Sequence, residues 1–167
     1  MVTAVSSGSR EGFHQADAAA AARFELASPA WMAAMIETIE TLLAEVDLGT
    51  AVFTMGETFT DLPDHIAAND GDDFSWHLRV TGKSVKVLSG RPEMDLNLRF
   101  ILSYPVGATL ARMVYGDDPA VHAERDRLVG TAIRDGRIRT IGQIADMPPQ
   151  VEAGMSQVHD KMAVRTC

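Results

Sequence analysis

The residues of this chain that are able to do acid–base chemistry are spread along the sequence, and one short segment brings several of them together. The segment DLPDHIAAND places Asp64 beside His65, and a carboxylate next to an imidazole can orient it for proton transfer. His77, on the polar side of an alternating segment, is the third candidate for a general base. The alternative interpretations are a plain acidic loop for Asp64 and His65, and a solvated or cross-strand-paired imidazole for His77.

Other kinds of chemistry find little support in the sequence. The five histidines show no HxH or HExxH spacing, and Cys167 is the single cysteine, so we expect neither a metal site nor a disulfide. No GxSxG elbow, P-loop or GxGxxG motif is present, which removes the usual signals of nucleophilic hydrolysis, nucleotide hydrolysis and dinucleotide redox chemistry. The sequence therefore predicts no cofactor.

Charge and length narrow the class of partner. The chain has 167 residues with 23 Asp and Glu against 15 Lys and Arg, a net charge of −8, which disfavours nucleic acid as a partner. Apolar runs are too short for stable membrane insertion, and no basic start is followed by an apolar segment, so we expect a cytoplasmic protein. We expect a flexible tail over residues 1–15 and a single domain over residues 16–167.

The elements that must position these residues follow from the spacing of apolar side chains. Three- and four-residue steps predict a helix from Ser28 to Gly49, a second one over 106–116 that ends at Gly116, a charged helix over 117–133 with Val121, Leu128 and Val129 facing inward, and a last helix after the double proline at 148–149. The alanine-rich segment 16–26 predicts a further short helix.

Alternating apolar residues predict strands between these helices. The predicted strands cover 50–59, 73–80, 84–90 and 93–102, followed by a short one in RDGRIRTIG whose arginines point outward. Because the strands over 73–102 share one apolar side, we expect them to form an antiparallel meander.

This order of elements resembles the sterol carrier protein type 2 family of nonspecific lipid-transfer domains. The resemblance is carried by WHLRVTGKSVKVLSG and EMDLNLRF, then by LARMVYG and RDGRIRTIG, and it covers about Pro29 to Pro149. It implies an α+β fold with a mainly antiparallel five-stranded sheet, helices packed on one face, and a cavity between them that holds acyl chains or sterols. It also implies that the double proline redirects the chain so that the last helix crosses the apolar face of the sheet. The segment 117–132 departs from the family pattern, where the connection is generally shorter.

Several residues on the apolar faces are candidates for lining such a cavity. Nine methionines are many for this length, and flexible thioethers suit an adaptable pocket, although they also fill gaps in an ordinary core. Tyr104 and Tyr115 flank one predicted helix, and the two interpretations are that either hydroxyl bonds a polar head group at the cavity entrance or that both rings cover exposed apolar surface. The predicted ligand-binding residues are Met35, Phe53, Trp76, Met94, Phe100, Met113, Tyr115, Met155 and Met162.

Three hypotheses for function follow. The first is binding, extending to transfer, of an apolar small molecule such as a lipid, sterol or acyl chain. The alternative is a small cofactor-independent enzyme of the proton-transfer, isomerase or lyase type that acts on a hydrophobic substrate in the same cavity. The third is an interaction protein without a small ligand, and a homodimer through a sheet edge or the amino-terminal helices stays open in all three.

Overall fold

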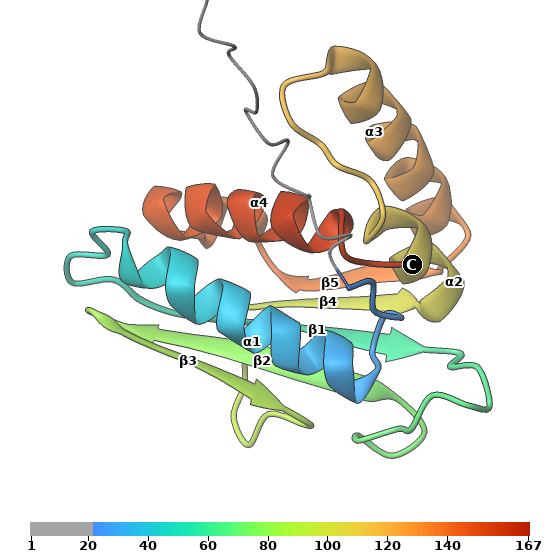
Figure 1. Cartoon of the computed structure of the whole chain (residues 1–167), viewed down its shortest axis with the longest axis horizontal. Helices are drawn as coiled ribbons and strands as arrows, with labels where there is room; N and C mark the ends of the chain where they lie inside the picture. Colours follow the sequence, from blue (N-terminus) through green and yellow to red (C-terminus); the bar gives the residue numbers. More distant parts are fainter. Residues whose placement is uncertain (1–21) are drawn as a thin grey trace, which may run out of the picture.

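The computed structural model describes residues 22–167, in which helices cover one side of a sheet (Figure 1). The predicted flexible tail, residues 1–15, lies outside the described residues. The α+β class is confirmed, because residues 22–167 form four α-helices, a short 3₁₀ turn and one five-stranded sheet. In chain order the elements are α1 (Pro29–Ala44), β1 (Val52–Thr60), β2 (Phe74–Thr81), β3 (Ser84–Ser89), β4 (Leu98–Ser103), α2 (Tyr104–Leu110), α3 (Pro119–Arg134), β5 (Ile138–Gly142), η1 (Ile144–Asp146) and α4 (Pro149–Ala163).

The sheet has the strand order β3-β2-β1-β4-β5, with β1 in the centre. The pairs β1–β2, β2–β3 and β4–β5 are antiparallel, whereas β1 and β4 run parallel. The prediction of a mainly antiparallel five-stranded sheet is therefore confirmed, and the one parallel pair makes the sheet mixed.

The predicted meander is wrong in its third strand. Instead of lying beside β3, β4 pairs with β1, and it begins at Leu98 because residues 90–97 form the loop that carries the chain across the sheet. Leu96 of this crossing loop passes over Gly56, where a Cβ would lie 2.6 Å from the Trp76 carbonyl oxygen and 2.8 Å from Leu96 Cδ1. Apolar alternation identifies the buried face of each strand but does not say which strand is its neighbour.

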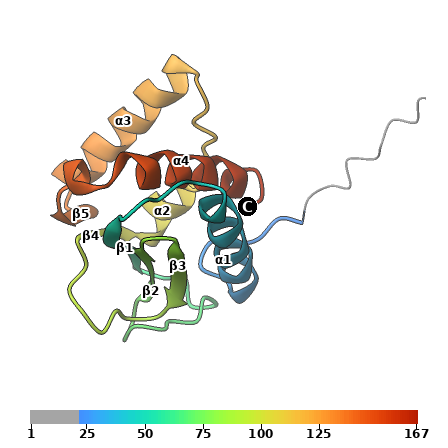
Figure 2. The same cartoon turned by 90° about the vertical axis from the view of Figure 1, so that its left-hand side faces the viewer.

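Helices α1 and α4 lie side by side over one face of the sheet (Figures 1 and 2), as predicted. The side chain of Ser28 caps α1 by accepting a hydrogen bond from the Trp31 N–H at 3.1 Å, and a proline is the first residue of both helices. Gly154 lets the two helices approach closely, because a Cβ there would clash with Leu43. The double proline thus starts the helix that crosses the apolar face.

Three predicted helices differ from the structure at their ends or in their burial. The first ends at Ala44, before Gly49, and the second, α2, ends at Leu110 rather than Gly116. Helix α3 spans Pro119–Arg134 but projects away from the sheet, so Val121, Leu128 and Val129 are half-buried and Ala132 is its one buried residue (Figure 2). Residues 22–26 do not continue a helix, since Phe24 forms a bridge to Thr166; the rest of segment 16–26 lies outside the described residues.

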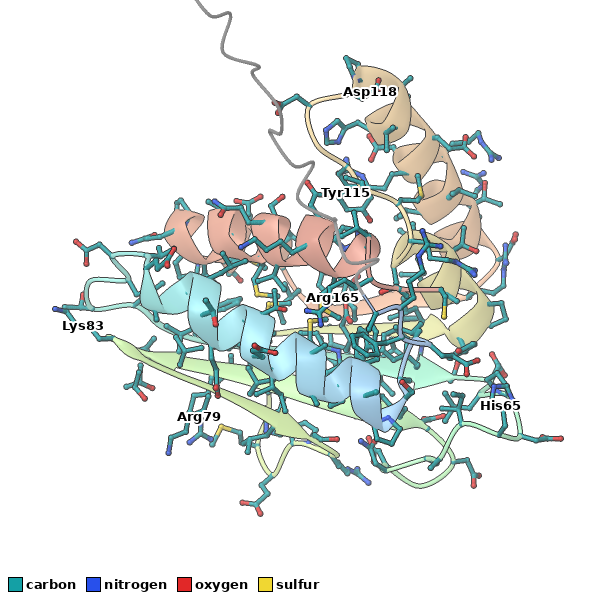
Figure 3. All side chains as sticks on the ribbon, viewed as in Figure 1. His65, Arg79, Lys83, Tyr115, Asp118 and Arg165 are labelled. Carbon is teal, nitrogen blue, oxygen red and sulfur yellow. The ribbon has the colours of Figure 1, made fainter. Side chains whose placement is uncertain are left out.

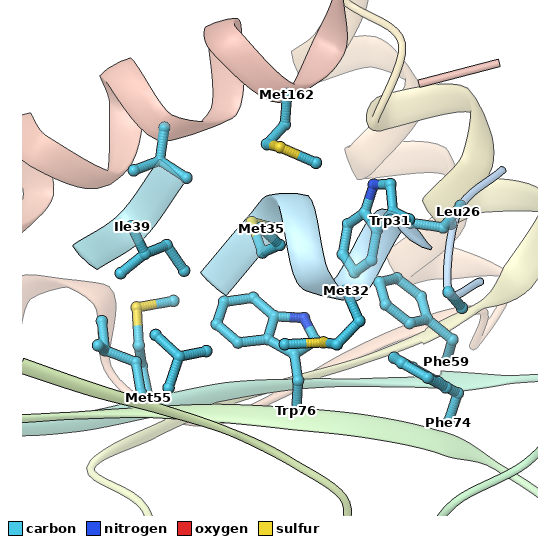
Figure 4. Packing of buried hydrophobic residues seen from close by; sticks show 14 of the residues in the cluster. Leu26, Trp31, Met32, Met35, Ile39, Met55, Phe59, Phe74, Trp76 and Met162 are labelled. Carbon is cyan, nitrogen blue, oxygen red and sulfur yellow. The ribbon is translucent and has the colours of Figure 1, made fainter. Parts of the chain in front are cut away.

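The hydrophobic core fills the space between the sheet and the helices α1 and α4. Figure 4 shows Met162 reaching down from α4 toward Met35 and Trp31 of α1, with Trp76 of β2 below them. Phe59 lies edge-on to Trp31, with ring centroids 6.3 Å apart. The largest fully buried side chains are those of Trp31, Trp76, Leu26, Ile39, Leu43, Leu48, Leu78 and Leu98.

Candidate ligand cavity

A cavity of about 300 Å³ lies between the sheet and the helices, beside this core. Small-molecule sites in proteins range over roughly 300–1,000 Å³, so this volume admits a small or slender ligand. Its walls are mainly apolar and come from the three central strands and from helices α1, α2 and α4. They are formed by Leu26, Trp31, Met35, Met55, Phe59, Trp76, Phe100, Leu102, Leu110, Ala111, Met147, Met155, Val158 and Met162.

The structure brings six of the nine predicted ligand-binding residues to this cavity. They come from every layer around it, which is what a cavity between sheet and helices requires. The six are Met35, Trp76, Phe100, Tyr115, Met155 and Met162.

The other three predicted residues lie elsewhere. Phe53 faces the helices, as expected from its alternation, but it is packed into the core at 2% exposure and does not line the cavity. Met94 lies on the crossing loop, where its sulfur is 2.9 Å from Arg79 Nη2. Met113 follows α2 and does not line the cavity. Its backbone carbonyl accepts a hydrogen bond from His159, which does.

The three predicted acid–base residues also lie away from the cavity. His65 is on the outside of the molecule (Figure 3), with its side chain 64% exposed and its Nε2 at 2.8 Å from Glu25 Oε1, so its carboxylate partner is not the exposed Asp64. His77 is buried rather than solvated, since the crossing loop covers it and its Nδ1 lies 3.3 Å from the Gly90 carbonyl. It points to the face of the sheet opposite to Trp76. Proton transfer in the cavity would therefore need another group.

Glu57 is that group, and the sequence analysis missed it. It lies on β1 between Met55 and Phe59, which point to the same side of the strand, and it lines the cavity. Trp76 Nε1 donates a hydrogen bond to Glu57 Oε2 at 3.0 Å. Burial raises the pKa of Glu57 to about 7, although the bond from Trp76 opposes this shift. A glutamate at an apolar position of an alternating strand was the available signal.

An aromatic and cationic group forms another part of the wall. The Tyr115 ring stacks on His159, with centroids 4.0 Å apart, and Arg125 Cζ lies 5.1 Å from the Tyr115 ring centroid. All three residues line the cavity, and Figure 3 shows Tyr115 between α3 and α4. Asp160 holds Tyr115 in place, because its carboxylate accepts hydrogen bonds from the backbone N–H of Tyr115 at 2.7 Å and of Gly116 at 3.0 Å.

The protonation states of this group follow from burial. Burial raises the pKa of Tyr115 to about 12, so the hydroxyl keeps its proton at neutral pH. Burial lowers the pKa of His159, which favours the neutral ring. Since the Met113 carbonyl can only accept, His159 Nε2 carries the hydrogen of their 2.9 Å bond. Arg125 is paired with Asp126, whose Oδ1 accepts from Nε at 2.9 Å and from Nη2 at 2.7 Å.

The described residues contain neither a cluster of metal-binding side chains nor a membrane-spanning helix. Within residues 22–167, no group of three or more His, Cys, Asp or Glu side chains is placed to hold a metal ion. Over the same part of the chain, no helix has the length and apolar character needed to cross a membrane.

Comparison with known proteins finds similarity to solved structures. No protein-family model matches the chain, and no curated protein matches it. Several solved structures to which the chain is similar are sterol carrier protein 2 and related domains, the family that the sequence resembles.

Three of these structures illustrate the extent of the likeness. A crystal structure of sterol carrier protein 2 is 15% identical with a TM-score of 0.49, over 83% of this chain and 100% of that one. The sterol carrier protein domain 2 of Helicoverpa armigera is 15% identical with a TM-score of 0.42, over 81% and 87% of the two chains. The palmitated SCP2-like 2 protein of Aedes aegypti is 16% identical with a TM-score of 0.37, over 75% and 91%.

Proposed function

We propose that this protein binds an apolar small molecule, such as a lipid, sterol or acyl chain, in the cavity between its sheet and helices. The observation that supports this most directly is the cavity of about 300 Å³ whose walls are mainly apolar. Each methylene group of a ligand that leaves water for such walls contributes about 0.8 kcal/mol. Five methionines, Met35, Met55, Met147, Met155 and Met162, line it and allow the walls to adapt to ligands of different shape.

Native mass spectrometry of freshly purified protein tests this function. We expect a bound mass that is lost when the same sample is denatured, or one that appears when a decyl-chain probe is added and exchanged. Organic extraction of the released material then gives its chemical class. A protein that carries no copurified apolar molecule, and takes up no apolar probe, would contradict the proposal.

Glu57 favours a second candidate function, a cofactor-independent proton transfer on a ligand held in the same cavity. The ionised form of a carboxyl group with a pKa of about 7 is able to remove a proton from the carbon beside a ligand carbonyl, which gives the enolate, and to return a proton to the same carbon, so atoms and electrons balance without a further reactant. Incubation with 2-decanone in deuterated buffer tests this, because Glu57-dependent exchange would replace the hydrogens beside the carbonyl. Equal exchange with the wild type and with Glu57→Gln would rule this candidate out.

A further inference from the structure

We propose that the ligand of this cavity is an amphiphile whose head group, a hydroxyl or an amine, donates a hydrogen bond to the Glu57 carboxylate. This inference rests on the proposed function, since it names the polar end of the molecule whose apolar part occupies the cavity. The observations that support it are the geometry of Glu57, the charges around it, and the pairing of Arg125, the cation at the cavity wall.

The two carboxylate oxygens of Glu57 differ in their hydrogen bonds. Oε2 is held by Trp76 Nε1, whereas Oε1 has no hydrogen-bond partner among residues 22–167. Protein atoms surround the side chain closely, and the surface that Glu57 leaves open belongs to the cavity wall. A carboxylate oxygen without a protein partner in mainly apolar surroundings is poorly compensated, and a ligand donor that reaches Oε1 supplies the missing hydrogen bond.

A head group in this cavity would meet mainly negative charge. Glu152 of α4 also lines the cavity, so two carboxyl groups face the ligand. The cation at the wall, Arg125 of α3, is already bonded to Asp126 through two nitrogens. An acyl carboxylate near Glu57 would therefore face like charge without a free guanidinium, whereas an ammonium group or a hydroxyl would not.

Glu57 accepts a hydrogen bond from a ligand donor most readily when it is ionised, which depends on pH. The pKa of Glu57 is raised to about 7, so the acceptor form is dominant above neutrality. Tyr115 keeps its proton because its pKa is raised to about 12, and the pKa of His159 is lowered by burial, so these two neighbours hold their neutral forms above neutrality. His122 lies behind Tyr115, with ring centroids 6.3 Å apart, and is a titratable neighbour that the experiment has to separate from Glu57.

Four probes with the same decyl chain test the head group: 1-decanol, decylamine, methyl decyl ether and decanoate. The ether accepts a hydrogen bond but does not donate one. Binding is followed by the fluorescence of the two tryptophans, Trp31 and Trp76, both of which line the cavity. At about pH 8.5, we expect 1-decanol and decylamine to bind about tenfold more tightly than the ether and decanoate, the factor that one extra net hydrogen bond provides.

The variants Glu57→Gln and Glu40→Gln make the same chemical change inside the cavity and at an exposed position of α1 outside it. Glu57→Gln should lower the affinity for decylamine about tenfold and remove its pH dependence, although His122 is still present. Glu40→Gln should keep both. Should Glu57→Gln not fold, the wild type still gives the answer, because its affinity for decylamine should rise, and that for decanoate fall, between about pH 5.5 and 8.5.

The outcomes separate this inference from the function on which it rests. Binding of none of the four probes would contradict the cavity function itself. Binding of all four with equal affinity, or tightest binding of decanoate, would overturn the head-group inference and leave the apolar cavity intact. Tighter binding of 1-decanol alone, or of decylamine alone, would identify which donor the site takes.

Discussion

Trp76 Nε1 donates a 3.0 Å hydrogen bond to Glu57 Oε2, and the two residues face each other directly across the β1–β2 pair. The carboxyl group therefore has one fixed partner in mainly apolar surroundings. The bond lowers the pKa of Glu57 and burial raises it, and burial has the larger effect, since the pKa rises to about 7. Two neighbouring residues thus combine an acceptor that faces the cavity with the donor that fixes its position.

We expect Glu57 to make the stability of the protein depend on pH. Its pKa is raised from 4.5 to about 7, so between these values the unfolded chain releases a proton that the folded chain keeps. Stability therefore falls as pH rises through this window, by up to about 3 kcal/mol, and levels off above it. Glu57→Gln should remove this fall. The free energy of unfolding of the variant relative to that of the wild type, measured by urea denaturation, should therefore increase from about pH 5 to 8.

Glu152→Gln is the control for this prediction, since it removes a carboxyl group from an exposed position of the same cavity. Its stability should run parallel to that of the wild type over the whole window. A constant difference between wild type and Glu57→Gln at every pH would mean that Glu57 ionises normally in the folded protein.

Removal of the tryptophan donor should raise the pKa of Glu57 further. Trp76→Phe deletes the N–H that favours the carboxylate, and we expect a loss of stability of about 1–3 kcal/mol from the bond and the changed ring. The Glu57 carboxyl carbon, followed by NMR during a pH titration, reports the pKa directly. Trp31→Phe is the matched control, because Trp31 Nε1 donates to Thr166 Oγ1 at 3.3 Å and does not bond Glu57. An equal Glu57 pKa in both variants would contradict the expectation.

The faces of the strands were predictable from sequence, but their neighbours were not. The alternation of Phe74, Trp76, Leu78 and Val80 identified the side that the helices cover, and all four are buried. The same alternation is compatible with β4 lying beside β3 or beside β1. The crossing loop decides between them, because it brings Leu96 into contact with Gly56, which lies 40 positions earlier in the chain. Local periodicity carries no information on such a contact.

The limits of prediction for the site have the same origin. His77 was predicted on a polar face, and the crossing loop buries it there. Six cavity residues were predicted because apolar faces that point toward each other must enclose any gap between them. Glu57 was missed because its strand was interpreted by apolar residues alone, although a carboxyl group in step with Met55 and Phe59 has to enter the same space.

Filling the cavity should abolish ligand binding while the fold is kept. Ala111, just after α2, lines the cavity and is half-buried, so Ala111→Phe places a ring in the space that a ligand would use. We expect loss of 1-decanol binding in the fluorescence titration and a circular dichroism spectrum like that of the wild type. Thr109→Phe adds the same ring at an exposed position outside this cavity and should bind normally. Unchanged binding by Ala111→Phe would place the ligand elsewhere.

Asp160 should control the segment that carries Tyr115 to the cavity. Its carboxylate accepts from the backbone N–H groups of Tyr115 and Gly116, which lie beyond the end of α2 and have no helical partner there. Asp160→Ala leaves both donors unpaired, so we expect a loss of stability of about 1–3 kcal/mol and faster hydrogen exchange at these two amides, with the amides of β1 and β2 less affected.

The control for this prediction is Asp135→Ala, which removes an exposed carboxylate whose partner is Arg137 at 2.8 Å. An exposed ion pair of this kind contributes about 0–1 kcal/mol, so stability and exchange should change little. Because Tyr115 stacks on His159 at the cavity wall, Asp160→Ala should also weaken 1-decanol binding, whereas Asp135→Ala should not. Normal exchange at Tyr115 and Gly116 in Asp160→Ala would show that the stacked ring, rather than the carboxylate, positions this segment.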